Sequence, residues 1–87
     1  MPRGPRRQAE WLAWDLEISD HAAKRSVLRG FSETDLRTML SEPSGFEPSA
    51  HEGRFVVHSR LGRERWRIVV EPDPEERKLM VVTAWRV

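Results

Sequence analysis

Three apolar segments joined by short connections form the last third of the chain, and they restrict its fold more than any other feature. They span residues 54–60, 65–71 and 78–86. In each of the first two, one strand face would be largely apolar and the other would carry arginines, as in strands with one buried face. Gly62 lies in the first connection, and the prolines of the second cannot continue a strand ladder. Because connections this short join antiparallel neighbours, the segments predict a three-stranded antiparallel sheet.

The first half of the chain predicts one strand and two helices. Residues 14–18 alternate apolar and polar side chains, which indicates a half-buried strand. Ser19 or Asp20 can cap a first helix over about residues 21–29, and Gly30 can end that helix.

The second helix has a sharper start. Ser32 and Asp35 have the spacing of a capping box. Pro43 ends this helix, and residues 43–53, rich in proline, serine, glycine and glutamate, predict a loop. The expected fold is therefore α+β, with one N-terminal strand, two helices and then the three-stranded antiparallel sheet. Both helices are expected to pack on one face of that sheet.

The chain of 87 residues is short enough to be a single domain. Residues 1–10 hold two prolines, a glycine and three arginines, and they predict a flexible basic tail ahead of a domain over residues 11–87. The sequence has no cysteine, so neither a disulfide nor a thiolate nucleophile is available. No apolar run approaches the roughly 20 residues of a membrane span, and a cytoplasmic location is expected.

The net charge of +1 hides a strong segregation of charge. Residues 54–67 carry five arginines and one glutamate. The planar guanidinium group matches phosphate oxygens, so this stretch indicates a partner rich in phosphate. A general coding bias toward arginine would explain the thirteen arginines beside two lysines equally well, but it explains their clustering less well.

Strand alternation places many of these arginines on one face of the predicted sheet. Arg54, His58 and Arg60 would share that face with two arginines of the next strand, Arg65 and Arg67. Such a face, with Trp85 as a stacking ring, would suit an RNA backbone and its bases. Ordinary surface polarity is the alternative interpretation.

The first predicted helix carries a second basic group. His21, Arg25 and Arg29 fall within an arc of roughly 80° at helical spacing. Ala23 and Val27 lie on the opposite side and are expected to pack against the rest of the domain. A solvated helix face is the alternative interpretation of this stripe.

These residue types fit metal-free cleavage of RNA. RNA supplies its own nucleophile, the 2′-hydroxyl group, and cleavage then needs an acid, a base and positive charge. Histidine serves as acid or base near neutral pH, and arginine stabilises the charged transition state. His21, His51 and His58 are not at metal-ligand spacing, so neither a metal nor a cofactor is expected.

Four short strings also give the chain a family resemblance. They are His21-Ala22-Ala23-Lys24-Arg25, Arg29-Gly30-Phe31-Ser32, Gly53-Arg54-Phe55-Val56-Val57 and Val81-Val82-Thr83-Ala84-Trp85. In this order they resemble small bacterial domains of unknown function with an HAxxR…RG opening. Those domains are similar to the BrnT toxin and, more distantly, to the RelE/ParE toxin superfamily. The likeness covers about residues 15–87 and implies a RelE-like fold.

The resemblance implies a toxin-like, metal-independent endoribonuclease of a bacterial toxin–antitoxin system. Its partners would be RNA, including ribosome-bound mRNA, and a cognate antitoxin, and a homodimer is compatible with so small a domain. The catalytic set would be His21, Arg25, Arg54, Thr83 and, from the sheet geometry, Arg67.

The substrate-binding set would be Arg29, His58, Arg60, Arg65 and Trp85, with His58 also the second candidate acid or base. The sequence departs from many RelE-type ribonucleases in having no tyrosine. The alternative is a non-catalytic module that binds RNA or a protein target.

Overall fold

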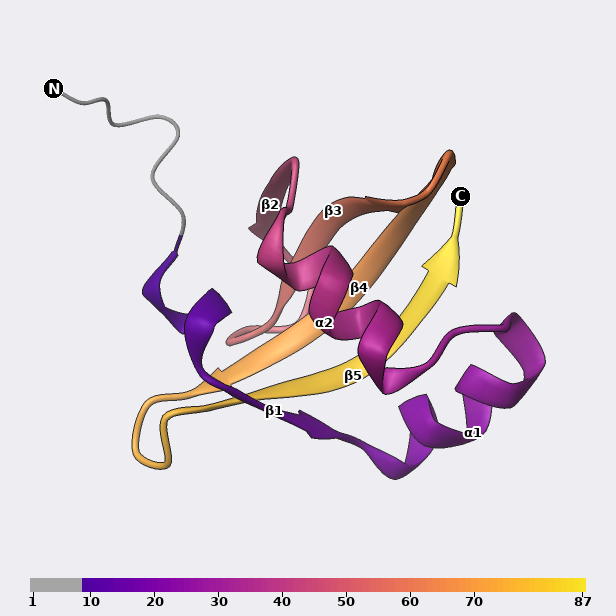
Figure 1. The fold of residues 1–87 in the computed structure, drawn as a ribbon. Helices are drawn as coiled ribbons and strands as arrows, with labels where there is room; N and C mark the ends of the chain where they lie inside the picture. Colours follow the sequence, from indigo (N-terminus) through magenta and orange to yellow (C-terminus); the bar gives the residue numbers. More distant parts are fainter. Residues whose placement is uncertain (1–8) are drawn as a thin grey trace, which may run out of the picture.

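The computed structural model describes residues 9–87, so most of the predicted tail at residues 1–10 lies outside the described residues. Within these residues, a short 3₁₀ helix, η2, comes first and is followed by two helices and five strands (Figure 1). Their order is η2 (Glu10–Ala13), β1 (Asp15–Ile18), α1 (Asp20–Arg29), α2 (Glu33–Ser41), β2 (Gly45–Pro48), β3 (Phe55–Leu61), β4 (Glu64–Asp73) and β5 (Lys78–Arg86).

The five strands form one mixed sheet in the order β1-β5-β4-β3-β2. The three predicted C-terminal strands are its centre, and they pair as antiparallel neighbours. The predicted fold class, RelE-like with a three-stranded antiparallel sheet, is nevertheless wrong. β1 joins the sheet in parallel beside β5, and β2 joins it beside β3.

Both additional strands lie at the edges of the sheet. β1 pairs with the last strand of the chain, and a parallel pair of this kind needs a long connection between its members. β2 forms inside the segment that was predicted to be a loop. It is only four residues long and ends at Pro48, which an edge strand tolerates because one side of its backbone faces away from the sheet.

Local signals determine where α1 begins and ends and where α2 begins. Ser19 caps α1 by accepting a hydrogen bond from the backbone N–H of Ala22. Gly30 ends α1 in the left-handed conformation, at φ 75°, which costs glycine little. Ser32 and Asp35 form the predicted capping box of α2, with both reciprocal hydrogen bonds present.

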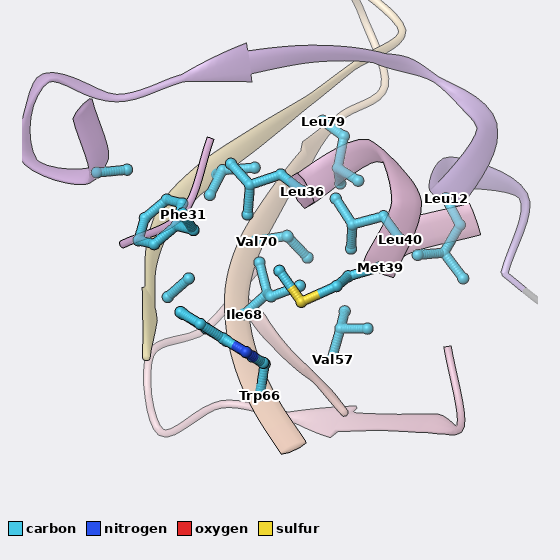
Figure 2. Packing of buried hydrophobic residues seen from close by; sticks show 13 residues of the cluster. Leu12, Phe31, Leu36, Met39, Leu40, Val57, Trp66, Ile68, Val70 and Leu79 are labelled. Carbon is cyan, nitrogen blue, oxygen red and sulfur yellow. The ribbon is translucent and has the colours of Figure 1, made fainter. Parts of the chain in front are cut away.

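The core lies between α2 and one face of the sheet (Figure 2). Leu36, Met39 and Leu40 of α2 pack over buried strand residues. Trp66 lies at one end of this core, with its ring centroid 5.6 Å from that of Phe31 in an edge-to-face contact. The strand residues buried beneath α2 are Val57, Trp66, Ile68, Val70, Leu79, Val81 and Ala84.

Helix α1 does not join α2 on that face but lies along the free edge of β5. β1 covers β5 only over residues 78–81, so the carbonyl groups beyond it lack a strand partner. The Ser19 hydroxyl donates to the Val82 carbonyl at 3.0 Å, and the Arg29 guanidinium donates to the Ala84 carbonyl at 2.9 Å. Polar groups of α1 therefore take the place of the missing strand.

This position of α1 corrects the prediction that Ala23 and Val27 pack. Val27 is 83% exposed, whereas Ala22 is fully buried. A strand edge offers carbonyl groups rather than an apolar surface, so the helix face against it holds a small residue and hydrogen-bond donors. Among residues 9–87, no helix is long and apolar enough to cross a membrane.

Candidate nucleic-acid interface

The sheet face opposite α2 is its outer face, and it carries the side chains that alternate with the core residues. On β3, β4 and β5, buried inner residues alternate with half-buried or exposed outer ones. The strand registers set the outer residues in cross-strand rows. The outer face comprises Arg54, Val56, His58, Arg60, Arg65, Arg67, Val69, Glu71, Met80, Thr83 and Trp85.

Three arginines gather at one end of the outer face. Arg60 and Arg65 are direct cross-strand partners, and Arg67 follows Arg65 on the same face of β4. Like charges directly opposite each other destabilise a sheet. Among residues 9–87, none of the three forms an ion pair with a carboxylate. The cluster is therefore a local excess of positive charge that a bound anion would neutralise.

The next row joins His58, Arg67 and Trp85 across three adjacent strands. His58 Nε2 lies 2.8 Å from a carboxylate oxygen of Glu47, which reaches it from β2. Arg67 occupies the middle of the row, between the imidazole and the indole ring. A cation, a titratable group and an aromatic ring therefore share one line across the outer face.

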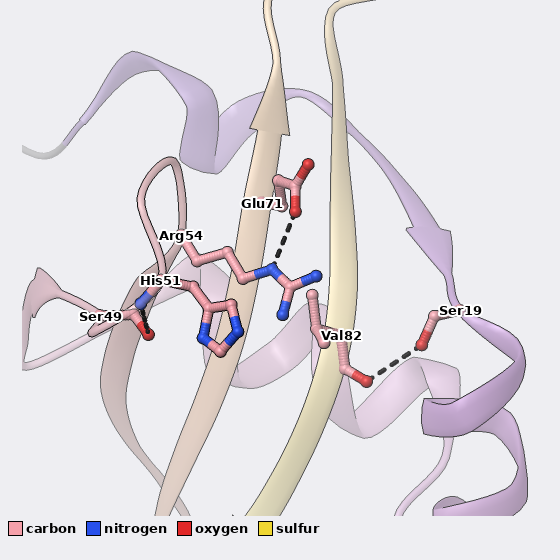
Figure 3. A network of polar contacts seen from close by, with 6 residues as sticks. All are labelled: Ser19, Ser49, His51, Arg54, Glu71 and Val82. Atoms are coloured by element: carbon pink, nitrogen blue, oxygen red, sulfur yellow. Dashed lines mark hydrogen bonds and ion pairs between the residues drawn. The ribbon is translucent and has the colours of Figure 1, made fainter.

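Arg54 lies further along the outer face and is held by Glu71. Its Nε donates to a Glu71 carboxylate oxygen at 2.9 Å. Figure 3 shows the guanidinium reaching over the sheet, between the turn that bears His51 and the Ser19–Val82 contact. Arg54 and Ser19 line one hollow of about 240 Å³ together with Glu17, Glu71, Asp73, Lys78, Met80 and Val82.

A β-bulge lies beside this hollow. Val69 pairs with Thr83 and Val70 pairs with Val81, so Val82 is an extra residue in β5. A bulge re-aims the side chains around it and is common beside functional sites. Arg29 reaches the bulge from α1, with its guanidinium 3.5 Å from the Thr83 hydroxyl. Arg29 therefore holds α1 to β5 and is already engaged by two groups of the protein.

His21 and Arg25 flank the outer face from α1. Ala22 and Arg29 mark the helix line that faces the edge of β5, because the first is buried and the second bonds to β5. Ser26 lies on one side of this line, in a hollow shared with the core residues Phe31 and Leu36. At about 100° per residue, His21 and Arg25 lie on the other side of the line, toward the outer face.

All ten sequence-predicted site residues thus lie on the outer face or along its α1 side, but they form two groups. One group is Arg29, Arg54 and Thr83 around the bulge, with His21 and Arg25 on the α1 side of the outer face. The other lies toward the arginine end and comprises His58, Arg60, Arg65, Arg67 and Trp85. His21 and His58 do not converge, because β5 and β4 lie between the helix and β3, and β3 alone is roughly 10 Å from β5.

Two acidic residues of this interface were missed from the sequence. Glu71 orients Arg54 and Glu47 holds His58, each within 2.9 Å. Leu61 pairs with Glu64 around a tight turn at Gly62, and counting outward from this turn puts position 54 opposite position 71. That count would have revealed Glu71. Glu47 gave no such signal, because β2 itself was unexpected.

Within residues 9–87, no three histidine, aspartate or glutamate side chains gather as a metal ion would require.

Comparison with known proteins identifies a family but no function. No curated protein and no solved structure matches this chain. One family model matches residues 18–86, and its description is "Domain of unknown function (DUF4258)". The match covers the outer face, the bulge and α1. The chain therefore belongs to the DUF4258 family of domains of unknown function.

Proposed function

We propose that this protein binds RNA on its outer face and cleaves it without a metal ion, by acid/base catalysis at a phosphodiester. The observation that carries the proposal is the cluster of Arg60, Arg65 and Arg67, which has no carboxylate partner among residues 9–87. Phosphate contacts of this kind supply most of the affinity of a protein for a nucleic acid.

The group around the bulge suits the chemical step. A base takes the proton of the 2′-hydroxyl, the 2′-oxygen attacks the adjacent phosphorus, and the 5′-oxygen leaves with a proton from an acid. His21 is the proposed acid or base, water serves as the other of the two, and Arg25 and Arg54 offset the charge of the transition state. The products are a 2′,3′-cyclic phosphate and a 5′-hydroxyl group. Thr83 would orient the phosphate or the ribose.

The biological role in the proposal rests on the resemblance of the four strings to small bacterial domains that are themselves similar to the BrnT toxin. It supports a toxin that is held inactive by a cognate antitoxin. A cytoplasmic location is part of the same proposal, because the substrate would be cellular RNA.

Total RNA incubated with the purified protein in EDTA tests the proposal. We expect cleavage that survives chelation and leaves 2′,3′-cyclic phosphate ends. A matched RNA with 2′-O-methyl groups should stay intact, since it lacks the nucleophile. Binding to both RNAs with no cleavage of either would contradict the catalytic part and favour the non-catalytic RNA-binding module. Absence of both binding and cleavage, with or without ribosomes, would overturn the proposal.

A further inference from the structure

Trp85 differs from the other three tryptophans in its surroundings. Each of those three has a close ring or cation partner: Trp11 has Phe55 at 4.9 Å, Trp66 has Phe31 at 5.6 Å, and Trp14 has Arg77 at 5.3 Å. Trp85 is half-buried on the outer face, and no other aromatic ring of residues 9–87 stacks on it. Its indole ring is therefore free to take an external ring as a partner.

Trp85 has arginines as neighbours on one side and mostly apolar residues on the other. Arg67 is its direct cross-strand partner, and Arg65 lies two residues further along the same face of β4. On the other side, the next row across the sheet holds Val56, Val69 and Thr83. Trp85 and the two valines thus adjoin two cations that have no carboxylate partner among the described residues.

The geometry points to single-stranded RNA as the ligand of the outer face, with one base stacked on Trp85 and the flanking phosphates on Arg65 and Arg67. This inference rests on the proposed function and narrows its substrate. An unpaired nucleotide exposes its base to an aromatic ring, whereas a duplex keeps the faces of its bases inside the helix. A duplex could reach the arginines but would leave Trp85 and the valine row uncovered.

Binding measured by fluorescence anisotropy tests this inference separately from catalysis. The probes are a labelled 2′-O-methyl RNA strand of about 12 nucleotides, which cannot be cleaved through its 2′-oxygen, and the duplex of the same sequence. We expect the wild-type protein to bind the single-stranded RNA at least tenfold more tightly than the RNA duplex. Trp85→Leu should weaken binding to the strand by roughly 5- to 100-fold and change duplex binding less than twofold.

Trp85→Phe keeps an aromatic ring and should retain most of the affinity for single-stranded RNA. Comparison with Trp85→Leu therefore separates loss of stacking from loss of the fold. Equal affinity of the wild type for strand and duplex would overturn the inference while leaving RNA binding intact. An unchanged affinity of a folded Trp85→Leu variant for the strand would also overturn it. Strand binding without any cleavage would leave this inference standing and remove only the catalytic proposal.

Discussion

His21→Ala is expected to slow RNA cleavage by roughly 100- to 10,000-fold, the usual contribution of a positioned acid or base. His21 is exposed in the first turn of α1, so its loss should change the free energy of unfolding by less than about 0.5 kcal/mol. RNA affinity should stay close to that of the wild type, because the arginine end of the outer face is unchanged. Single-turnover cleavage of labelled RNA and urea unfolding measure these effects.

His58→Ala is the matched comparison, since His58 is the second candidate acid or base. It is bound to Glu47 on the far side of β4 from α1, so we expect its loss to affect binding more than the chemical step. Full activity of folded His21→Ala beside an inactive His58→Ala would transfer the role to His58 and contradict the assignment of His21.

Replacing Arg60, Arg65 and Arg67 by glutamine should weaken RNA binding roughly 1,000-fold, at about 1.5 kcal/mol for each charged contact. The slope of log affinity against log salt should become less negative by about 2, since each phosphate contact in a single strand contributes about 0.7. The free energy of unfolding should not fall, because the variant removes the repulsion between Arg60 and Arg65. Salt titrations and urea unfolding measure the two effects.

A second triple variant matches the first in net charge. It replaces Arg37, Arg77 and Arg86 by glutamine. Each of these arginines already forms an ion pair with a carboxylate: Arg37 pairs with Glu33, Arg77 pairs with Glu10, and Arg86 pairs with Glu64. We expect this variant to keep most of the RNA affinity and of the salt slope. An equal loss in both triple variants would mean that overall charge, and not the outer face, determines binding.

The parts of this structure that local chemistry determines were predictable from the sequence. Serine caps set the starts of both helices, Gly30 sets the end of α1, and short turns set the pairing of β3, β4 and β5. Strand alternation correctly placed Arg54, His58, Arg65 and Arg67 on one face.

The parts that depend on distant contacts were not predictable. β1 pairs with a strand more than sixty residues away, and β2 is a short edge strand in a segment of turn-forming residues. The predicted packing of α1 was wrong for a different reason. Its environment is a strand edge, so Ser19 and Arg29 satisfy carbonyl groups there while Val27 stays in solvent. The apolar periodicity of a helix predicts packing on the face of a sheet. It does not indicate packing against the edge of a strand.

The outer face is the proposed RNA-binding surface, and NMR of isotope-labelled protein titrated with a single-stranded 2′-O-methyl RNA tests this assignment. We expect the side-chain N–H signals of Trp85 and Arg67 to shift on binding. The indole signal of Trp66, buried in the core, and the Nε signal of Arg37 on α2 should stay in place. Shifts confined to Arg37 and to the exposed Val27–Leu28 pair, with Trp85 and Arg67 unchanged, would contradict the claim.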